Sequence, residues 1–318
     1  MMIDVEQAVK RLLQQDRVCI LAHASPDGDT LGSAYGLYYA LRELGKQARV
    51  RCADPVPSQY AHLCREYREE DFEEGFVMAV DVAAPKLLGS LEAVYAGRIQ
   101  LCLDHHPTNE GYAQESCVWP QAAAACELVY EVVRLLGAPV TPMVADCLYT
   151  GIATDSGCFK YPSTSPQTHR MAAQLMEAGA DYSRINERLF DTKTKGRILV
   201  EQAVLNSIRF FAGDRVALIT IPRSLLEHAQ AAEGDLDGLA ALPRMIEGVD
   251  IGLTLREKEE GVWKVSVRTG SRADASVLCG KFGGGGHARA SGCLIRAGYD
   301  EAVRMLTEAA EQLLEPLE

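Results

Sequence analysis

The chain has 318 residues, of which 47% are hydrophobic and 24% charged, a composition typical of a folded globular protein long enough for two domains. Its formal net charge of −12 argues against a protein that coats long duplex DNA, because such proteins are usually basic. No segment approaches the roughly 18 consecutive apolar residues of a transmembrane helix, and the acidic, amphipathic N-terminus lacks the pattern of a signal peptide.

Strand-like and helix-like patterns alternate along the first 190 residues. After an amphipathic helical pattern at 1–18, apolar runs typical of buried strands follow at 17–23, 47–53, 75–81 and 99–106. Helical spacing occurs at 31–45, 123–137, 144–155 and 165–180, where Gly45 and Gly137 close two helices and Ser165 begins the last. We therefore predict an α/β domain over 1–190, with a five-stranded parallel sheet and helices on both faces.

The pattern changes after residue 190. The segment 191–207 starts polar and becomes helical, and we interpret it as a linker. Strand-like runs follow at 215–221, 250–270 and 291–298, with a hairpin turn near Glu259–Gly261, and a helical pattern starts at residue 300. We therefore predict a smaller α+β domain over 208–318, with a mixed, mostly antiparallel sheet.

Ionisable residues stand at the ends of four segments of the first domain. Ligands of open α/β sheets bind beyond the carboxyl ends of the strands, so we expect these residues to converge. Close carboxylates repel one another unless a cation lies between them. A ligand set of imidazoles and carboxylates suits Mn²⁺ or Mg²⁺ better than it suits metal ions that prefer thiolate ligands. The residues are His23, Asp27, Asp29, Asp81, Asp104, His105, His106 and Asp155.

Each of these residues alone has a simpler explanation. A single carboxylate after a strand, such as Asp81, is most often a turn or cap residue, and the segment 25–30 is compatible with a type I turn. A lone His105 is most often a half-buried, hydrogen-bonded histidine. The joint pattern favours a dinuclear metal centre, in which two ions about 4 Å apart activate a water and hold both oxygens of a phosphoryl displacement.

Four motifs of the first domain resemble those of the DHH phosphoesterase superfamily: HxxPDGD, a strand-end Asp, DHH and GIATDSGxFxY. The segment FGGGGHARASG (282–292) resembles the glycine-rich signature of the DHH-associated C-terminal domain. The two-domain length is similar to that of the NrnA-type oligoribonucleases, which also act as phosphatases of 3′-phosphoadenosine 5′-phosphate (pAp). One departure is the run of alanines at 122–125, where relatives usually carry Ser or Thr.

The resemblance implies a role for each residue of the first domain. His23 and Asp27 would bind one metal ion, and Asp81 would bridge to the other. Asp104 would orient the histidine next to it, and His106 would face the phosphate rather than a metal ion. The ligands implied for the second ion are Asp29, His105 and Asp155.

The glycine run at 283–286 is followed by His287 and Arg289. A glycine run alone is most often a flexible loop, but glycine also lets backbone N–H groups approach a phosphate closely. Five basic residues lie between 268 and 296 against the single acid Asp274, which suits a small phosphorylated ligand. The resemblance implies contacts from Arg268 and His287 to a terminal phosphate or base. The full set of expected substrate contacts is His106, Arg268, Gly284, Gly285, Gly286, His287 and Arg289.

These motifs predict a Mn²⁺-dependent phosphodiesterase, an exoribonuclease acting on short RNA (nanoRNA), which also dephosphorylates pAp to AMP. Two Mn²⁺ ions per active site are expected, with Mg²⁺ or Co²⁺ as substitutes. The main alternative is a cyclic di-AMP or pApA phosphodiesterase. The intact ligand set argues against a nucleotide-binding regulator with a dead metal site, and the glycine loop argues against a family II pyrophosphatase.

Ten cysteines are scattered singly without a CxxC pair, which predicts buried thiols in a reducing cytoplasm rather than a zinc or disulfide framework. No membrane partner is expected. The resemblance implies a homodimer.

Overall fold

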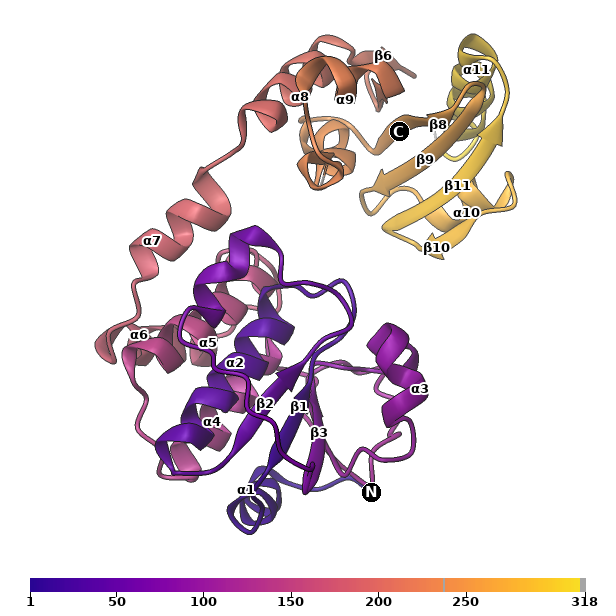
Figure 1. Ribbon diagram of the computed structural model, residues 1–318. Coiled ribbons are helices and arrows are strands. Elements are labelled where there is room, and N and C mark those ends of the chain that lie inside the picture. Colours follow the sequence, from indigo (N-terminus) through magenta and orange to yellow (C-terminus); the bar gives the residue numbers. More distant parts are fainter. Residues whose placement is uncertain (237, 315–318) are drawn as a thin grey trace. The chain divides into compact units, whose positions relative to one another are not determined.

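The computed structural model describes residues 1–236 and 238–314. The chain divides into two compact units, Met1–Thr192 and Lys193–Glu318, and each is described here by itself (Figure 1). The division lies two residues after the domain end predicted at 190. Most of the segment predicted as a linker forms helix α8 (Lys195–Asn206) of the second unit.

A five-stranded parallel sheet forms the centre of the first unit, which confirms the predicted fold class. Its strand order is β2-β1-β3-β4-β5, so the carboxyl ends of all five strands lie at one edge. The sequence pattern did not indicate β5, because its residues ESCV lack a continuous apolar run. The strands are β1 (Val18–Leu21), β2 (Ala48–Arg51), β3 (Phe76–Val80), β4 (Leu101–Asp104) and β5 (Glu115–Val118).

Helices cover both faces of this sheet. Helices α1, α2, α4 and α5 share the larger core with one face, and η2 and α3 pack on the other (Figure 1). Ser165 caps α6 with a capping box and Pro166 is its first residue, as predicted. The helices are α1 (Val5–Leu13), α2 (Gly28–Glu43), η1 (Ser58–Cys64), η2 (Pro85–Leu91), α3 (Glu92–Tyr95), α4 (Ala125–Leu135), α5 (Pro142–Asp155), α6 (Pro166–Glu177), α7 (Tyr182–Asn186) and η3 (Glu187–Asp191).

A stripe of glycines on α2, formed by Gly28, Gly32 and Gly36, lets α5 pack unusually close. Residues four apart lie on one face of a helix, so the three glycines form one continuous surface. A Cβ atom added to Gly36 would lie 2.8 Å from Cδ2 of Leu148, and one added to Gly28 would overlap the side chain of Thr154. This contact brings the N-terminus of α2 to the C-terminus of α5, where the predicted metal ligands stand.

Gly151 of α5 packs directly against the predicted metal ligand Asp29, and this contact leads to a prediction. We expect Gly151→Ala to destabilise the protein by about 1–3 kcal/mol, although alanine favours helices, because the new methyl group overlaps Sγ of Cys126 and lies 2.8 Å from Oδ1 of Asp29. The affinity of the centre for metal ions should fall together with the stability, because the methyl group displaces Asp29. The matched control is Gly280→Ala, a helical site with nothing within 4 Å, which should be neutral or stabilising in thermal melts. Equal stability of the two variants would contradict the prediction.

The second unit contains a six-stranded mixed sheet in the order β10-β11-β9-β8-β7-β6. Only the β7–β8 pair is parallel, and β8 and β9 form the predicted hairpin. The strands are β6 (Arg209–Phe211), β7 (Val216–Ile221), β8 (Ile251–Glu259), β9 (Val262–Thr269), β10 (Gly285–His287) and β11 (Ala290–Arg296).

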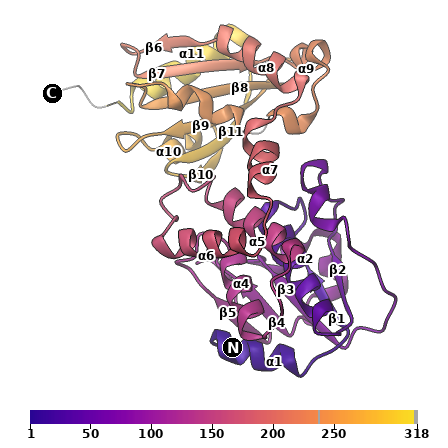
Figure 2. The same cartoon turned by 90° about the vertical axis from the view of Figure 1, so that its left-hand side faces the viewer.

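Helices also cover both faces of the second sheet (Figure 2). α10 (Ala275–Gly280) and α11 (Tyr299–Glu311) share one core, while α8, α9 (Arg223–Ala229) and η5 (Leu239–Met245) share the other; η4 spans Glu233–Leu236. Residues 315–317 of the predicted C-terminal helix lie outside the described residues. All ten cysteines are free thiols. Among the described residues, no helix has the length and apolar character needed to cross a membrane.

Candidate metal centre

The first group of predicted ligands lies beyond the ends of β1 and β3. Nε2 of His23 is 3.6 Å from Oδ1 of Asp27 and 3.6 Å from Oδ2 of Asp81. Nδ1 of the same ring lies 2.8 Å from the carbonyl oxygen of Ala24, so Nδ1 donates to that oxygen and Nε2 faces the carboxylates. Asp27 is held in place as the N-cap of α2, where its Oδ1 accepts hydrogen bonds from two backbone N–H groups.

A second group adjoins the first and comes from α2, β4 and α5. Nε2 of His105 is 3.3 Å from Oδ2 of Asp155 and 3.7 Å from Oδ2 of Asp29. Its other ring nitrogen, Nδ1, lies 3.2 Å from the carbonyl oxygen of Ala122, which again directs the lone pair of Nε2 towards the carboxylates. Within each group the potential ligand atoms lie within 4.8 Å of one another.

Asp81 lies between the two groups. Its Oδ1 is 3.6 Å from Nε2 of His105, while its Oδ2 faces His23. The residue is only 3% exposed, and no hydrogen bond partner for Oδ1 exists among the described residues. Its backbone has a φ of +56°, a conformation that costs a non-glycine residue about 1–3 kcal/mol. A buried carboxylate oxygen without a donor is stabilised when a cation binds to it.

Asp29 also caps the N-terminus of α4. Its Oδ2 accepts a hydrogen bond of 2.6 Å from the N–H of Ala125, and its Oδ1 accepts one of 2.9 Å from the N–H of Cys126. The N-cap residue of that helix is Ala124, which has no side-chain oxygen to offer. The N-terminus of α4, whose own N-cap residue offers no side-chain acceptor, is therefore capped by a predicted metal ligand.

Asp104 organises the DHH turn. Its Oδ1 accepts hydrogen bonds from the N–H of His105 at 2.8 Å and from Nδ1 of His106 at 2.8 Å, so its side chain orients the ring of His106. The ring of His105 is oriented instead by a backbone carbonyl. Asn109 donates a 2.6 Å hydrogen bond to Oδ2 of Asp104. The sequence analysis missed Asn109, although its place in the polar turn after DHH was a usable signal.

The carboxylates of this centre lie close enough to raise one another's pKa values. Burial and the charge of Asp27 raise the pKa of Asp29 to about 6, and burial and the charge of Asp29 raise the pKa of Asp155 to about 7. Burial, together with Asp29, also raises the pKa of Asp81 well above its usual value. Two imidazole nitrogens and four carboxylates, one with an orphaned oxygen, form a donor set that fits a pair of divalent cations.

The predicted substrate contacts of the second unit lie on β9, β10 and the turn to β11. Gly284 and Gly286 are required by packing, because a Cβ atom on the first would overlap Cys293 and one on the second would lie 2.7 Å from the carbonyl oxygen of Ala290. A Cβ atom on Gly285 would meet nothing within 4 Å. Gly285 and Gly286 of the run therefore lie in a short antiparallel pair with β11, and Gly285 has open space beside it.

The charged residues around this run have different environments. The guanidinium group of Arg289 donates to the carbonyl oxygens of Gly270 and Ala273, so it holds a neighbouring turn. His287 is exposed at the end of β10, and Arg268 is half-buried on β9. The contacts of these residues to a substrate remain predictions.

Comparisons with known proteins point to one family. Residues 17–152 match the model of the DHH family, N-terminal domain, and residues 213–315 match that of the DHHA1 domain. The chain is 33% identical over 304 residues to the bifunctional oligoribonuclease and PAP phosphatase NrnA of Thermus thermophilus, covering 93% of this chain and 90% of that protein. It is 25% identical over 314 residues to NrnA of Bacillus subtilis, covering 95% and 96% of the two chains.

One solved structure has the same fold along nearly the whole chain. It is an exopolyphosphatase-related protein from Bacteroides fragilis, with a TM-score of 0.82, 23% sequence identity, and coverage of 97% of this chain and 96% of that one.

Proposed function

Since this chain belongs to the DHH/DHHA1 family of phosphoesterases and is therefore a hydrolase, we propose that it cleaves short oligoribonucleotides to mononucleotides and dephosphorylates pAp to AMP. The observation that carries the proposal is the pair of adjoining ligand groups with Asp81 between them. Both reactions are displacements at phosphorus by water, so one centre serves both. The relatives named for these two activities match over nine-tenths or more of the chain.

Two Mn²⁺ ions are the proposed cofactor. His23, Asp27 and Asp81 would hold one ion, and Asp81 would also help to hold the second. When bound, the ions lower the pKa of a water nucleophile and neutralise charge on the phosphoryl oxygens. The remaining ligands of the second ion would be Asp29, His105 and Asp155.

His106 is proposed to contact the substrate phosphate. The hydrogen bond from its Nδ1 to Asp104 raises its pKa to about 9, so the ring is protonated near neutral pH. With Nδ1 engaged by its hydrogen bond to Asp104, the Nε2–H of the ring is left to donate a charge-assisted hydrogen bond to a phosphate oxygen. The Nε2 atom has no hydrogen bond partner among the described residues and is available for this contact.

The second unit is proposed to position the substrate. Arg268 and His287 offer side-chain donors, and the backbone beside Gly285 is open to a phosphate. Contacts to phosphate carry no base information, so we expect tolerance of RNA sequence. We also predict the homodimer implied by the family resemblance, which light scattering of the purified protein tests.

A substrate panel tests the proposal. The protein is stripped of metal by chelation, reloaded with Mn²⁺, and assayed with an RNA dinucleotide, pAp, pApA and cyclic di-AMP. We expect hydrolysis of the dinucleotide and pAp, with cyclic di-AMP at least about tenfold slower in kcat/KM, a difference of about 1.4 kcal/mol in transition-state binding. Preference for cyclic di-AMP would favour the alternative assignment, and inactivity on all four compounds would refute both.

A further inference from the structure

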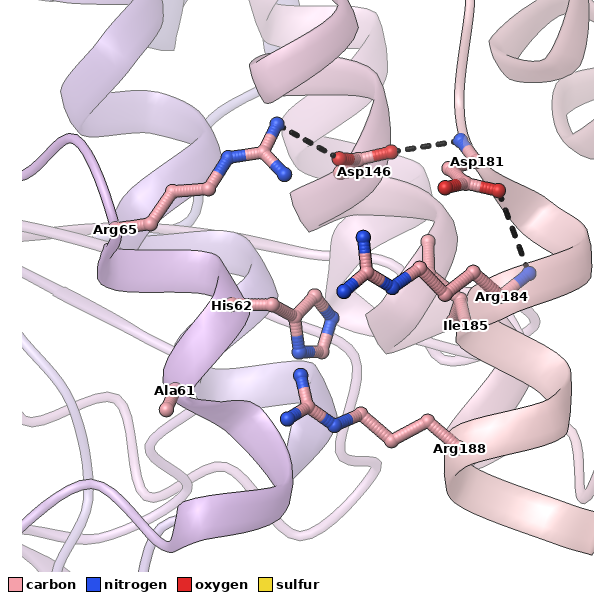
Figure 3. A pocket seen from close by; sticks show the side chains of 8 residues that line it. All are labelled: Ala61, His62, Arg65, Asp146, Asp181, Arg184, Ile185 and Arg188. Carbon is pink, nitrogen blue, oxygen red and sulfur yellow. Dashed lines mark hydrogen bonds and ion pairs between the residues drawn. The ribbon is translucent and has the colours of Figure 1, made fainter. Parts of the chain in front are cut away.

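A pocket in the first unit, separate from the metal centre, gathers three arginines around one histidine (Figure 3). Its volume is about 330 Å³, and its walls come from η1, α5, α7 and η3. Asp146 in its wall precedes Asp155 on α5 by nine residues. At 1.5 Å per residue, this places the pocket about 13 Å from the metal centre along the helix.

The acids of this pocket already have partners. Asp146 is buried, and its Oδ2 lies 3.3 Å from Nη2 of Arg65 while its Oδ1 accepts a 2.8 Å hydrogen bond from the N–H of Asp181. The side chain of Asp181 in turn accepts a hydrogen bond from the N–H at the start of α7. Among the described residues, no hydrogen bond or ion pair engages the guanidinium groups of Arg184 and Arg188, and both point into the pocket (Figure 3).

His62 shows how these charges act on the pocket. Its Nδ1 lies 3.2 Å from the carbonyl oxygen of Gln59, and its Nε2 lies 3.2 Å from Oγ1 of Thr150, whose own proton is donated to a backbone carbonyl. Both nitrogens therefore face acceptors, as they would in a protonated ring. Burial lowers the pKa of His62, and the positive charges of the three arginines lower it further. A bound anion would relieve this conflict.

We propose that this pocket binds a nucleoside monophosphate, with the phosphate on Arg184 and Arg188 and the nucleoside against Ala61 and Ile185. Unpaired guanidinium groups hold phosphate through paired hydrogen bonds, and their flat faces stack on aromatic bases. The volume lies at the lower end of the range of small-ligand pockets, roughly 300–1,000 Å³, which suits a mononucleotide. This site is independent of the hydrolytic activity proposed above, because it uses none of the metal ligands.

Calorimetry with AMP tests the site on the full, metal-free chain, where hydrolysis is absent. We expect wild-type protein to bind AMP, and Arg184→Ala and Arg188→Ala each to weaken binding by about tenfold or more, because each removes a charge-assisted contact. Arg170→Ala is the matched control: it removes an exposed arginine of the same unit that hydrogen bonds to Gln167 outside the pocket, and should bind AMP like wild type. Thermal melts of all variants report folding.

Two further ligands separate the parts of the proposal. Inorganic phosphate and adenosine should each bind at least about tenfold more weakly than AMP, because each makes only part of the contacts. If phosphate binds as tightly as AMP, the nucleotide assignment is wrong. If AMP does not bind to the wild-type protein, or binds to both arginine variants as tightly as to wild type, the site itself is refuted.

The NMR titration of His62 gives a second measurement. AMP should raise the pKa of this ring in the wild-type protein and not in Arg188→Ala, since the anion offsets the positive charges around it. An unchanged His62 pKa at saturating AMP would contradict the proposed position of the phosphate. The charged groups that line the pocket with His62 are Arg65 directly after η1, Asp146 on α5, Asp181 at the N-cap of α7, Arg184 on α7 and Arg188 on η3.

Discussion

Asp81→Asn should lose hydrolysis of both pAp and short RNA, with kcat reduced by more than about 100-fold. Loss of a residue that only hydrogen bonds to a metal ligand lowers metal affinity or activity by about 10–100-fold. Because Asp81 faces both ligand groups directly, its loss should cost more. Steady-state assays at saturating Mn²⁺ measure the effect. The matched control is Asp71→Asn, an exposed carboxylate in the same unit, which should retain wild-type turnover.

The same substitution should stabilise the protein when no metal is present. Asp81 is buried next to Asp29 with one oxygen unpartnered, so removing its charge relieves repulsion and should raise stability by about 1 kcal/mol or more at pH 8. Thermal melts after chelation, compared between wild type and Asp81→Asn, measure this. Full activity of the variant would refute the bridging role, and a destabilised metal-free variant would indicate that the carboxylate is a structural element instead.

Chelation should abolish all hydrolysis, and it should leave a protein whose stability falls as the pH rises from about 5 to 9. The cause is that several groups of the centre bind protons more tightly in the folded chain than in the unfolded one. The carboxyls of Asp29 and Asp155 have pKa values of about 6 and 7, against an ordinary value of 3.8. Their contribution is fully present below their ordinary pKa and is lost as the pH rises through the folded values.

The histidines of the centre act in the same direction. Burial opposes the protonation of His23, but the carboxylates of Asp27 and Asp81 raise its pKa to about 11, and Asp104 raises that of His106 to about 9. Their stabilisation is present below pH 6.5 and declines above it. Burial raises the pKa values of Asp27 and Asp104, but their histidine partners lower them further, so the net pKa values lie below the ordinary value. These two carboxylates stabilise the folded chain above about pH 4, and their contribution is lost only in more acidic solution. They therefore oppose the decline of stability with rising pH only in acid.

Denaturant titrations of the metal-free protein at several pH values test this trend. The Mn²⁺-loaded protein is the control, and its stability should rise with pH over the same range, because the metal ions replace protons on the ligands. A metal-free protein that is equally stable at pH 5 and pH 9 would show that the carboxylates do not share one buried centre.

The glycine run shows how far local sequence reasoning extends. Four consecutive glycines indicate a chain that can approach a ligand closely, and Gly285 has open space beside it. The structure shows that Gly284 and Gly286 are there because β11 lies against them. Glycines required for packing and glycines suited to ligand contact are identical in sequence, so only their neighbours distinguish them.

The pattern of the residues alone determined the alternation of strands and helices, the change of architecture after the first domain and the list of ionisable residues at strand ends, because periodicity and end position are local properties of the chain. Only the tertiary structure decided that Asp29 caps α4, that Asp104 holds the ring of His106, and that Arg65 and Arg188 line one pocket. These contacts join residues on separate elements, and their geometry depends on how helices pack against the sheet and on the strand register. That packing depends on the whole folded chain and cannot be predicted from any short segment of the sequence.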